Sequence, residues 1–520
     1  MSQSTITFLI LAVTVAVFVW DHLPVGVVAF GVALSLWATG VLGLEQALAG
    51  FGDPTVLFIA SLFVVSAALE ATGVTALVGQ ALVVRAGNDR TRVVVLTMVV
   101  VALVTAFITV NASVAALTPV VVLMAVRLRR SPSQLLMPVA FAAHAGSLLA
   151  LTGTPVNVIV SDYADEAGVG RFGFFEFALV GVPLVAGTIA IVVLLGPRLL
   201  PERTPRAITR DFSSHARTLV EHYGLDEVPA TLVSRGSGVA EVVIPPRSGL
   251  IGERIFPGMV TDSGDLVVLA IHRKGEELAG ECTLDAGDAL LLRGAWGALE
   301  QHLADPDVLV VDEPELVRRQ VVPFGSGAKR AIAILLAMVV LLTTGAVPAA
   351  VAGLLAAGAI VVFGVLTIEE AYRAIAWTTV ILVGGMIALS TAMVETGAAG
   401  QLADRLVEIV GDAGPHALLL GLFLLTAVLG QLISNMATAL IVIPVALSAA
   451  AEMDVSAKPV LMAVAVSAAA AFLTPVATPA NLMVLGPGGY RFGDYWKLGL
   501  PLLALFGVVA VLLVPVIWSL

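Results

Sequence analysis

The sequence predicts an all-α polytopic membrane protein built from two inverted repeats, with a small α+β domain inserted between them. Composition is the first reason. Of the 520 residues, 59% are hydrophobic and 12% are charged, and the mean hydropathy is +1.02, which is far too apolar for a soluble chain of this length. A polar motif that occurs twice is the second reason, and a charged segment at about residues 203–322 is the third. The net charge of −11 lies in loops and in that segment, and no nucleic-acid-binding signal appears.

The polar motif recurs at one constant offset of 324 positions. Asn111 recurs as Asn435, and the run Thr-Pro-Val-Asn at 154–157 recurs as Thr-Pro-Ala-Asn at 478–481. Chance seldom gives two separate motifs the same offset, so the chain is a duplicated unit. An internal repeat in a membrane protein is typical of a transporter whose site lies where the repeats meet.

The first half begins with apolar runs of bilayer-spanning length near residues 5–20, 24–43 and 54–72. Residues 93–126 then carry no charge, although Asn111 lies in their middle and the second arm is short for a full span. We predict a re-entrant helical hairpin whose polar tip is buried in protein, where irregular backbone is tolerated at membrane depth. Two ordinary spans, with Asn111 in an external turn, are the alternative.

A broken helix follows the hairpin. Residues 132–161 contain no Lys, Arg, Asp or Glu, but Gly153 and Pro155 interrupt the helix and leave backbone groups unpaired beside Asn157. A last span near 175–199 closes the first half. The second half follows the same plan, with spans near 330–345, 347–365 and 377–395, a hairpin at 413–451, a broken span at 459–484 and a final span at 495–518.

Each half is expected to cross the membrane five times, because a hairpin returns to the side from which it entered. An odd count inverts the second half. The positive-inside rule makes the side with more Lys and Arg cytoplasmic. The basic residues of short loops on that side are Arg85, Arg90, Arg92, Arg127, Arg129, Arg130, Arg198, Lys329, Arg330, Arg373, Arg491 and Lys497, and those on the other side are Arg171, Arg405 and Lys458. Both termini are then expected outside and the insert inside.

The charged segment predicts a separate cytoplasmic domain. We divide the chain into membrane repeat 1 (1–202), a linker (203–237), the inserted domain (238–312), a second linker (313–328) and membrane repeat 2 (329–520). Strand-like runs at 238–244, 265–272 and 288–293 and a short helix at 295–303 indicate a small α+β fold. The single cysteine, Cys282, excludes an internal disulfide.

Uncharged polar side chains are the candidate ligands of the membrane halves. Neither hairpin and neither broken span contains Lys or Arg. A bound anion would therefore depend on helix N-terminal dipoles and on amide or hydroxyl donors, while a cation would use carbonyls freed by the breaks. Four asparagines in duplicated register supply such groups, namely Asn111, Asn157, Asn435 and Asn481. The alternative is that they only cap the breaks or join helices.

His144 lies in the first broken span and is paired with Ala468 by the offset. An intramembrane histidine is a candidate functional residue, and this one could relay a proton. A hydrogen-bonded structural role is the interpretation we favour, because the second half has no histidine at this place.

At these motifs the chain resembles a known family. The hairpin asparagines, the breaks TGTPVN (152–157) and TPVATPAN (474–481), and the closing GPGGYRFGDYWKLGLPL (486–502) resemble those of the divalent-anion/sodium symporters. That family belongs to the wider ion-transporter superfamily of sulfate, dicarboxylate, citrate and arsenite carriers, and the resemblance covers both membrane halves. The insert, with AEVVIPPRSGLIGERI (240–255) and LDAGDALLLRGAWGALEQHL (284–303), resembles a TrkA C-terminal domain, the C-terminal domain of regulators of potassium conductance.

The resemblance implies a homodimer in which a transport domain of hairpins and broken spans moves against a dimerising scaffold. The implied sodium ligands, shared between two sites, are Asn111, Gly153, Asn157, Ser434, Asn435, Ala477 and Asn481. The implied substrate ligands are Asn111, Ser113, Thr154, Pro155, Ser434, Asn435, Thr438, Thr478 and Pro479. The family's Ser-Asn-Thr hairpin signature reads Val-Asn-Ala at 110–112 and Ser-Asn-Met at 434–436, so Ser113 and Thr438 are expected to supply the missing hydroxyls.

We therefore expect a secondary active symporter of a small divalent anion, such as sulfate or a dicarboxylate. It would be coupled to Na+, or alternatively to H+, and would work by an elevator-type motion. It is expected to be no enzyme, to need no cofactor, and to lie as a multi-pass protein in the inner or plasma membrane of a bacterial cell. The insert is expected either to sense a nucleotide or another small molecule, or only to dimerise the chain.

Two other function classes stay open at this point. A regulated potassium channel or transporter would need a carbonyl filter, for which Gly-Gly-Tyr at 488–490 is the only candidate. A cation/proton antiporter would normally need a buried carboxylate, and the central segments contain none.

Overall fold

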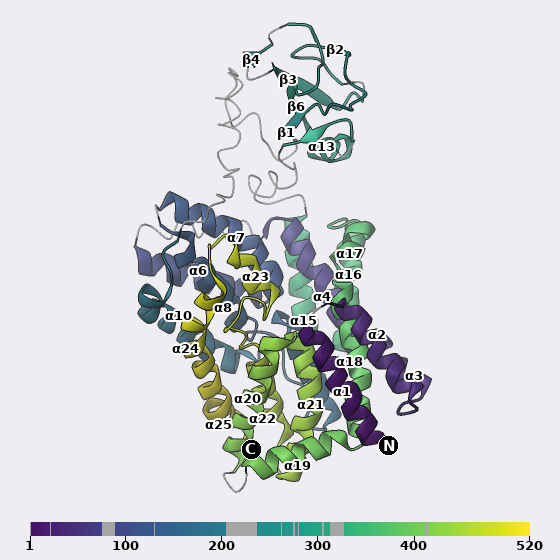
Figure 1. The fold of residues 1–520 in the computed structure, drawn as a ribbon, viewed down its shortest axis with the longest axis vertical. Helices are drawn as coiled ribbons and strands as arrows, with labels where there is room; N and C mark the ends of the chain where they lie inside the picture. Colours follow the sequence, from purple (N-terminus) through teal and green to yellow (C-terminus); the bar gives the residue numbers. More distant parts are fainter. Residues whose placement is uncertain are drawn as a thin grey trace. The chain divides into compact units, whose positions relative to one another are not determined.

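The computed structural model describes two compact units, which Figure 1 draws as ribbons. The membrane unit comprises residues 1–208 and 327–520, and the insert unit comprises residues 209–326. The described residues are 2–20, 22–74, 89–128, 130–203, 237–261, 263–273, 276–278, 280–303, 306–311, 327–410 and 414–520. The two predicted linkers lie almost entirely outside them.

The first half of the membrane unit is a series of apolar helices. They are α1 (Gln3–Trp20), α2 (Val25–Ala38), α3 (Leu44–Ala49), α4 (Pro54–Ala71), α6 (Arg90–Thr105), α7 (Val110–Arg127), α8 (Leu136–Gly146), α9 (Pro155–Glu166) and α10 (Ala178–Leu199). Short 3-10 turns lie at Gly50–Gly52 (η1), Pro132–Gln134 (η2) and Leu151–Gly153 (η3). Pro54 and Pro155 each open a helix, where the missing N–H costs nothing.

The second half repeats this series. Its helices are α15 (Ala328–Thr344), α16 (Ala349–Val362), α17 (Ile368–Ala374), α18 (Trp377–Glu395), α19 (Ala398–Val410), α20 (Pro415–Leu432), α21 (Asn435–Glu452), α22 (Ala457–Ala468), α23 (Pro479–Leu485), α24 (Tyr495–Val508) and α25 (Val514–Ile517). A 3-10 turn, η6 (Phe492–Asp494), precedes α24, and a π-helical turn, η7 (Val509–Leu513), joins α24 to α25.

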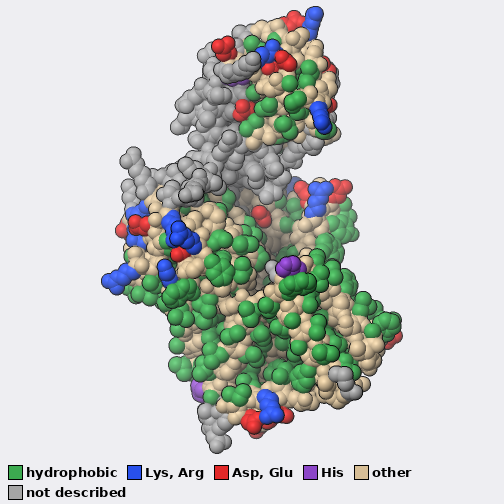
Figure 2. Space-filling view, in the orientation of Figure 1, with side chains coloured by type: hydrophobic (Ala, Val, Ile, Leu, Met, Phe, Trp, Pro, Cys, Tyr) green, Lys and Arg blue, Asp and Glu red, His purple; other side chains and the backbone are tan. Residues whose placement is uncertain are grey.

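The helices confirm a mostly helical, multi-pass membrane protein. Seven stretches of the described residues are helical, long enough and apolar enough to cross a membrane. Figure 2 shows hydrophobic side chains over the middle of the membrane unit, with Lys, Arg, Asp and Glu side chains gathered towards its ends. Three short helices, α3, α17 and α19, were not predicted. They are short or carry charged residues, so a search for long apolar runs passes over them.

The offset of 324 positions relates the helices of the two halves as well as the motifs. Added to the bounds of α2, it gives the bounds of α16, and it places α4 on α18, α7 on α21 and α9 on α23 to within one residue at their starts. In Figure 1, α17 lies near the upper end of the membrane unit, whereas its equivalent, α3, lies lower, next to α2.

Two helix crossings between the halves are also equivalent, since α2 packs on α18 and α4 packs on α16. At the first crossing, a Cβ on Gly385 would lie 2.5 Å from the carbonyl oxygen of Ala29. At the second, a Cβ on Gly353 would lie 2.1 Å from Oγ of Ser61. Small residues let helix backbones approach closely in a membrane, and the offset pairs Ala29 with Gly353 and Ser61 with Gly385.

The insert unit contains an antiparallel sheet of strand order β4-β3-β6-β1-β7. Its elements are β1 (Ser237–Val243), β2 (Arg254–Ile255), β3 (Leu266–Arg273), β4 (Glu276–Glu277), β5 (Cys282–Thr283), β6 (Ala289–Ala295), α13 (Trp296–His302) and β7 (Leu309–Val310). The three predicted strands and the predicted helix are confirmed. The two-residue strands were not predicted, because an alternating pattern needs more residues to be seen.

An ion pair joins the partly exposed Arg273 of β3 to the buried Asp288 just before β6. Arg273 donates from Nε and Nη2 to the two carboxylate oxygens of Asp288, at 2.8 and 2.7 Å. Burial raises the pKa of the Asp288 carboxyl, but hydrogen bonds from Arg273 and from the Asp285 N–H lower it below its ordinary value overall. The bidentate geometry favours arginine over lysine at this position.

Candidate functional site

Each half contains a helix break that is closed by the side chain of a buried asparagine. In the first half, Nδ2 of Asn157 donates to the carbonyl oxygens of Ser147 and Ala150, both at 2.9 Å. In the second half, Nδ2 of Asn481 donates to the carbonyl oxygens of Ala471 and Thr474, at 2.8 and 3.1 Å. The offset relates every atom of the first set to one of the second. Both asparagines therefore hold together the backbone that the break has freed.

The same contacts orient the two carboxamide oxygens. Because Nδ2 faces two carbonyl acceptors in each case, the Oδ1 atoms of Asn157 and Asn481 must point elsewhere. Both residues have an exposed fraction of 0%, and neither Oδ1 has a hydrogen-bond partner among the described residues. A buried polar atom without a partner is costly, so these two oxygens are candidate ligands for a bound donor or cation.

Threonine and proline begin the helix that follows each break. Thr154 caps α9, and its Oγ1 accepts the Val156 N–H at 3.4 Å. Thr478 caps α23, and its Oγ1 accepts the Asn481 N–H at 3.3 Å. Pro155 and Pro479 are the first helical residues.

The residues just before these caps differ between the halves. A Cβ on Gly153 would lie 2.2 Å from the Ser147 carbonyl oxygen, so the first break requires glycine there. Its equivalent, Ala477, is buried, and its N–H donates to Oγ1 of Thr474 at 3.2 Å. The two breaks thus share their fold but not every contact.

The segments predicted as hairpins form the helix pairs α6–α7 and α20–α21. Because α20 and α21 are each long and apolar enough to cross a membrane, re-entry stays a prediction. Asn111 is exposed and makes no side-chain hydrogen bond to the described residues, whereas Oδ1 of Asn435 is buried and without a partner. Oγ of Ser434 accepts the N–H of Ala437 at 3.3 Å and so caps α21. Equivalent asparagines thus have different surroundings at the two tips.

The two hydroxyls expected to complete the hairpin motifs are both buried. Ser113 and Thr438 have exposed fractions of 0%. Oγ of Ser113 donates to the carbonyl oxygen of Ile108 at 3.5 Å. Oγ1 of Thr438 has no partner among the described residues, so the second tip presents a buried hydroxyl beside the Asn435 carboxamide.

Each hairpin tip is attached to the break of its own half. Oγ1 of Thr152 donates to the Ala106 carbonyl oxygen at 2.9 Å. In the second half Gln431 makes this attachment, since its Oε1 accepts the Leu473 N–H at 3.1 Å and its Nε2 donates to the Ala470 carbonyl oxygen at 3.3 Å. Gln431 was not predicted from the repeat, because the residue at the equivalent position is Phe107.

His144 connects the two halves at the breaks. It lies in the last turn of α8 with an exposed fraction of 2%, and its Nε2 is 3.1 Å from Oγ1 of Thr478. The ring of Phe472 packs edge-on against the imidazole, with centroids 5.8 Å apart. These contacts fit the hydrogen-bonded role favoured from the sequence, and the proton relay stays a prediction.

The helices that carry these residues also pack across the repeat boundary, α7 on α23 and α9 on α21. The structure therefore joins both breaks and both tips into one region. The segments that form it, 106–113, 147–157, 430–438 and 470–481, contain no Lys, Arg, Asp or Glu. Any ion held there would be held by amides, hydroxyls, carbonyls and helix dipoles.

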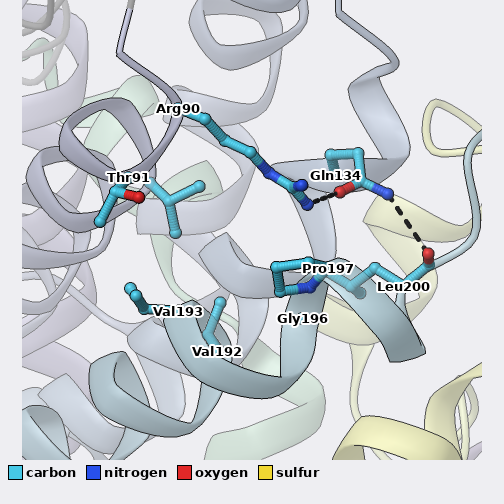
Figure 3. A pocket seen from close by; sticks show the side chains of 9 residues that line it. Arg90, Thr91, Gln134, Val192, Val193, Gly196, Pro197 and Leu200 are labelled. Atoms are coloured by element: carbon cyan, nitrogen blue, oxygen red, sulfur yellow. Dashed lines mark hydrogen bonds between the residues drawn. The ribbon is translucent and has the colours of Figure 1, made fainter.

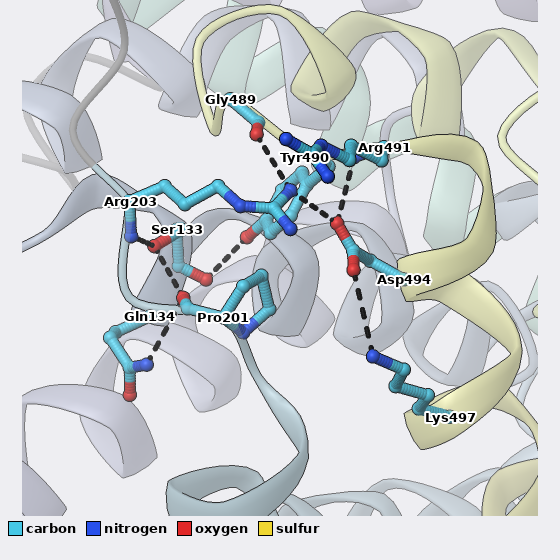
Figure 4. Close-up of polar contacts among 9 residues, drawn as sticks. All are labelled: Ser133, Gln134, Pro201, Arg203, Gly489, Tyr490, Arg491, Asp494 and Lys497. Carbon is cyan, nitrogen blue, oxygen red and sulfur yellow. Dashed lines mark hydrogen bonds and ion pairs between the residues drawn. The ribbon is translucent and has the colours of Figure 1, made fainter.

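The Gly-Gly-Tyr run at 488–490 has a structural role, which argues against a channel filter. The Tyr490 hydroxyl donates to the Ser133 carbonyl oxygen at 2.5 Å and accepts the Met137 N–H at 2.8 Å. Arg203 donates to the Gly489 carbonyl oxygen at 3.1 Å and to Oδ2 of Asp494 at 2.6 Å. Figure 4 shows this polar cluster, in which the candidate filter carbonyl of Gly489 is already engaged by a guanidinium.

A small cavity lies away from the breaks, near the start of α6 and the end of α10. Its volume is about 30 Å³ and its lining includes Arg90, Gln134 and Leu200. Figure 3 shows Arg90 hydrogen-bonded to Gln134, whose amide reaches the Leu200 carbonyl oxygen. Such a volume holds little more than a water molecule, so this cavity is not the site of a solute.

Comparison with known proteins gives a consistent family. A family model described as CitMHS, citrate transporter, matches residues 15–450 and 412–520. The uncharacterized transporter YfbS of Escherichia coli (strain K12) is 32% identical over 98% of this chain and 98% of its own length. The probable sodium/sulfate cotransporter 3 of Chlamydomonas reinhardtii is 26% identical over 56% of this chain and 33% of its own length.

A solved structure supports the fold. The YdaH transporter of Alcanivorax borkumensis, whose crystal structure is described as revealing an unusual topology, aligns with 97% of this chain and 99% of its own, with a TM-score of 0.51 and 16% identity. No family match identifies the insert as a TrkA C-terminal domain. Since one family model covers both membrane halves and a relative above 30% identity covers nearly the whole chain, the protein belongs to the citrate transporter family of membrane transporters and is not an enzyme.

Proposed function

We propose that this protein is a secondary active symporter that carries a small divalent anion, such as sulfate or a dicarboxylate, together with Na+. The observation that carries the proposal is the pair of buried Oδ1 atoms of Asn157 and Asn481, which have no partner and lie at equivalent breaks. The sodium/sulfate cotransporter of Chlamydomonas supports the choice of ions.

The anion is bound without a cationic side chain. The N-termini of α7, α9 and α21 carry the positive ends of helix dipoles, and Thr154, Ser434 and Thr438 add hydroxyl groups in two of the four polar segments. Asn111 and Asn435 add carboxamide donors. A site of this kind binds a dianion through many weak hydrogen-bond donors. The empty site then contains no buried cationic side chain whose desolvation would cost free energy.

The sodium ions are bound by oxygen atoms. Carboxamide oxygens and the backbone carbonyls freed by a helix break are ligands that suit a hard cation. Asn157 with Gly153 and Asn111 forms the first proposed site, and Asn481 with the residues 434–435 and Ala477 forms the second. H+ remains the alternative coupling ion, with His144 as the group to test.

Transport requires the polar region to face each side of the membrane in turn. We take the two halves as inverted repeats with five crossings each and hairpins that re-enter. The equivalent crossings of α2 with α18 and α4 with α16 make those helices one group. The hairpins and broken helices form a second group, which moves against the first in an elevator-type motion within a homodimer.

The insert is proposed to act as a TrkA C-terminal-like regulatory domain. Arg203 donates to Asp494, next to the second broken helix. Deletion of residues 205–320 tests this proposal. Unchanged uptake and unchanged response to nucleotides would leave dimerisation as the domain's role.

The experiment for the function is uptake of radiolabelled sulfate into proteoliposomes, with and without an inward Na+ gradient and with succinate or citrate as competitors. We expect Na+-driven uptake in the wild type. Asn111→Ala and Asn435→Ala should each lower uptake by about tenfold or more, because each removes a proposed ligand of both ions. Gln401→Ala, which removes an exposed carboxamide on α19, is the matched control.

Full uptake by both asparagine variants would rule out the proposed site. Uptake driven by a proton gradient alone would show that the coupling ion is H+ and not Na+. His144→Gln would then be the next variant to measure. Competition by dicarboxylates at low concentration would favour a dicarboxylate over sulfate as the substrate.

A further inference from the structure

The first broken helix is hydrogen-bonded to the other helix group at its C-terminal end. Oγ1 of Thr55, at the start of α4, donates to Oδ2 of Asp162 at 2.6 Å. The hydroxyl of Tyr163 donates to Oγ of Ser390, on α18, at 2.7 Å. Neighbouring residues of α9 thus bind two helices, one from each half of the chain.

Two of the four partners are buried, and the Asp162 side chain is 29% exposed. Thr55 and Ser390 have exposed fractions of 7% and 1%. Oδ1 of Asp162 accepts a second hydrogen bond from Arg171 at 3.3 Å, which holds the carboxylate in place. A carboxylate and a phenol are therefore fixed at the boundary between the two groups of helices.

The repeat duplicates one side of this arrangement but not the other. Thr55 has the equivalent Thr379, and Ser390 has the equivalent Ser66. Asp162 and Tyr163, however, are equivalent to Gly486 and Pro487, which have no polar side chain. Among the described residues, neither Ser66 nor Thr379 makes a side-chain hydrogen bond comparable to those of its equivalent.

Inverted repeats relate the two end states of a transporter. If the halves exchange their arrangements when the site turns to the other side of the membrane, each contact in one state is replaced by its equivalent in the other. Thr379 would then meet Gly486, and Ser66 would meet Pro487. Neither pair can form a side-chain hydrogen bond, so the exchanged state lacks both contacts.

The exposure of the two breaks indicates that the structure is one such end state. Val476, in the second break, has an exposed fraction of 64%, whereas its equivalent in the first break, Thr152, has 2%. The second break is thus exposed at Val476 and Pro479, where the first is less exposed at Thr152 and Pro155, although Thr478 is more buried than its equivalent Thr154. An exchange of the halves would reverse the exposed fractions of Val476 and Thr152.

We propose that Asp162 and Tyr163 are positioning residues that hold the transporter in the open state, in which the second break is exposed at Val476. The proposal rests on the proposed alternating-access function and adds the residues that set its conformational balance. The two hydrogen bonds are present in one state and absent in the other. They shift the equilibrium between the two states by the free energy that they contribute to the first state only. The expected shift is about threefold for each bond, the usual size for a side-chain hydrogen bond in a membrane.

The test reads the population of this state from a single cysteine. In a Cys282→Ser, Val476→Cys protein in proteoliposomes, the rate of maleimide labelling reports how often the second break is open. We expect Thr55→Val and Ser390→Ala each to lower the open-to-closed equilibrium constant about threefold and the double variant to lower it about tenfold, so that labelling slows by up to these factors. Each removes one hydrogen bond and leaves Asp162 and Tyr163 in place.

The repeat supplies the matched controls. Thr379→Val and Ser66→Ala make the same chemical changes at equivalent positions that have no such partners, and they should label as the parent does. A Thr55→Val, Ser390→Ala protein that labels like these controls would overturn the proposal, as would a parent protein whose residue 476 is not labelled. Labelling does not depend on the anion. A lack of sulfate uptake would therefore count against the proposed function, while the labelling rates would still test the role of Asp162 and Tyr163.

Discussion

Asn157 in the first half and Asn481 in the second make the same pair of hydrogen bonds to backbone carbonyls, at 2.9 and 2.9 Å and at 2.8 and 3.1 Å. Around these equal contacts the halves differ. Thr152 hydrogen-bonds the first break to the hairpin of its half, and Gln431 does the same for the second break. The side chain of His144 hydrogen-bonds only to the second break. Contacts common to both halves build the fold of the repeat. Contacts in one half alone make the two sides of the transporter unequal.

The largest effect is expected from the asparagines that close the breaks. Asn157→Ala and Asn481→Ala each remove two hydrogen bonds and leave two carbonyls unpaired in the interior. Each variant should lower the free energy of unfolding by about 2 kcal/mol, at about 1 kcal/mol per bond in a membrane. Thermal unfolding in detergent measures this loss, which should be nearly equal for the two variants.

Unequal losses of unfolding free energy in these two variants would show that the two asparagines are not equivalent in stabilising their breaks. If Asn481→Ala were much less harmful than Asn157→Ala, His144 and Gln431 would be holding the second break without the asparagine. The double variants with His144→Ala and Gln431→Leu would then show which of the two does so, because coupled residues lose their additivity.

A comparable effect is expected at the first helix crossing and a smaller one at the second. A Cβ on Gly385 would lie 2.5 Å from a backbone oxygen of Ala29, whereas a Cβ on Gly353 would meet the side chains of Ser61 and Phe58. Side chains can turn aside more easily than a helix backbone can move. Gly385→Ala should therefore cost about 1–3 kcal/mol of unfolding free energy, and Gly353→Ala should cost less.

The repeat also predicts a rescue at the second crossing. Gly353→Ala combined with Ser61→Gly reproduces the Ala29–Gly385 pair of the first crossing and should recover at least half of the lost stability. Thermal unfolding of the single and double variants measures it. No recovery would mean that the ring of Phe58, 2.6 Å from the added Cβ, is the real obstacle.

The sequence predicted the two helix breaks because their causes are local, whereas re-entry of the hairpins stays a prediction. Pro155 and Pro479 begin the helices that follow the breaks, and the first break requires glycine at position 153, although Pro119 and Pro444 lie inside unbroken helices. The contact of His144 with Thr478 was not predictable, because it joins residues 334 positions apart. Asn111 and Asn435 share a motif, yet only the second has a buried Oδ1. Burial depends on how whole helices pack, and a repeated motif carries no information about that.

The smallest effect compares the loops that lead into the last helix of each half. Glu176 precedes α10, accepts the Gly173 N–H at 2.7 Å and pairs with Lys458 of the other half at 3.0 Å. Asp494 precedes α24, accepts the Arg491 N–H at 2.8 Å and pairs with Arg203. Each half thus supplies a carboxylate for a cation of the other.

The first of these pairs gives a pH dependence. Burial raises the pKa of Glu176, but hydrogen bonds from the Gly173 N–H, the Trp518 indole and Lys458 lower it below its ordinary value overall. A lowered pKa contributes stability above the unfolded value of about 4.3, and this contribution is lost as the pH falls through the folded pKa. The side chains of Glu176 and Lys458 are 23% and 22% exposed, so the contribution should stay below about 1 kcal/mol. Glu176→Gln should therefore lower the unfolding temperature at neutral pH and have almost no effect near pH 3. An equal fall in the unfolding temperature at both pH values would show that the shape of the Glu176 side chain, and not its charge, stabilises the loop.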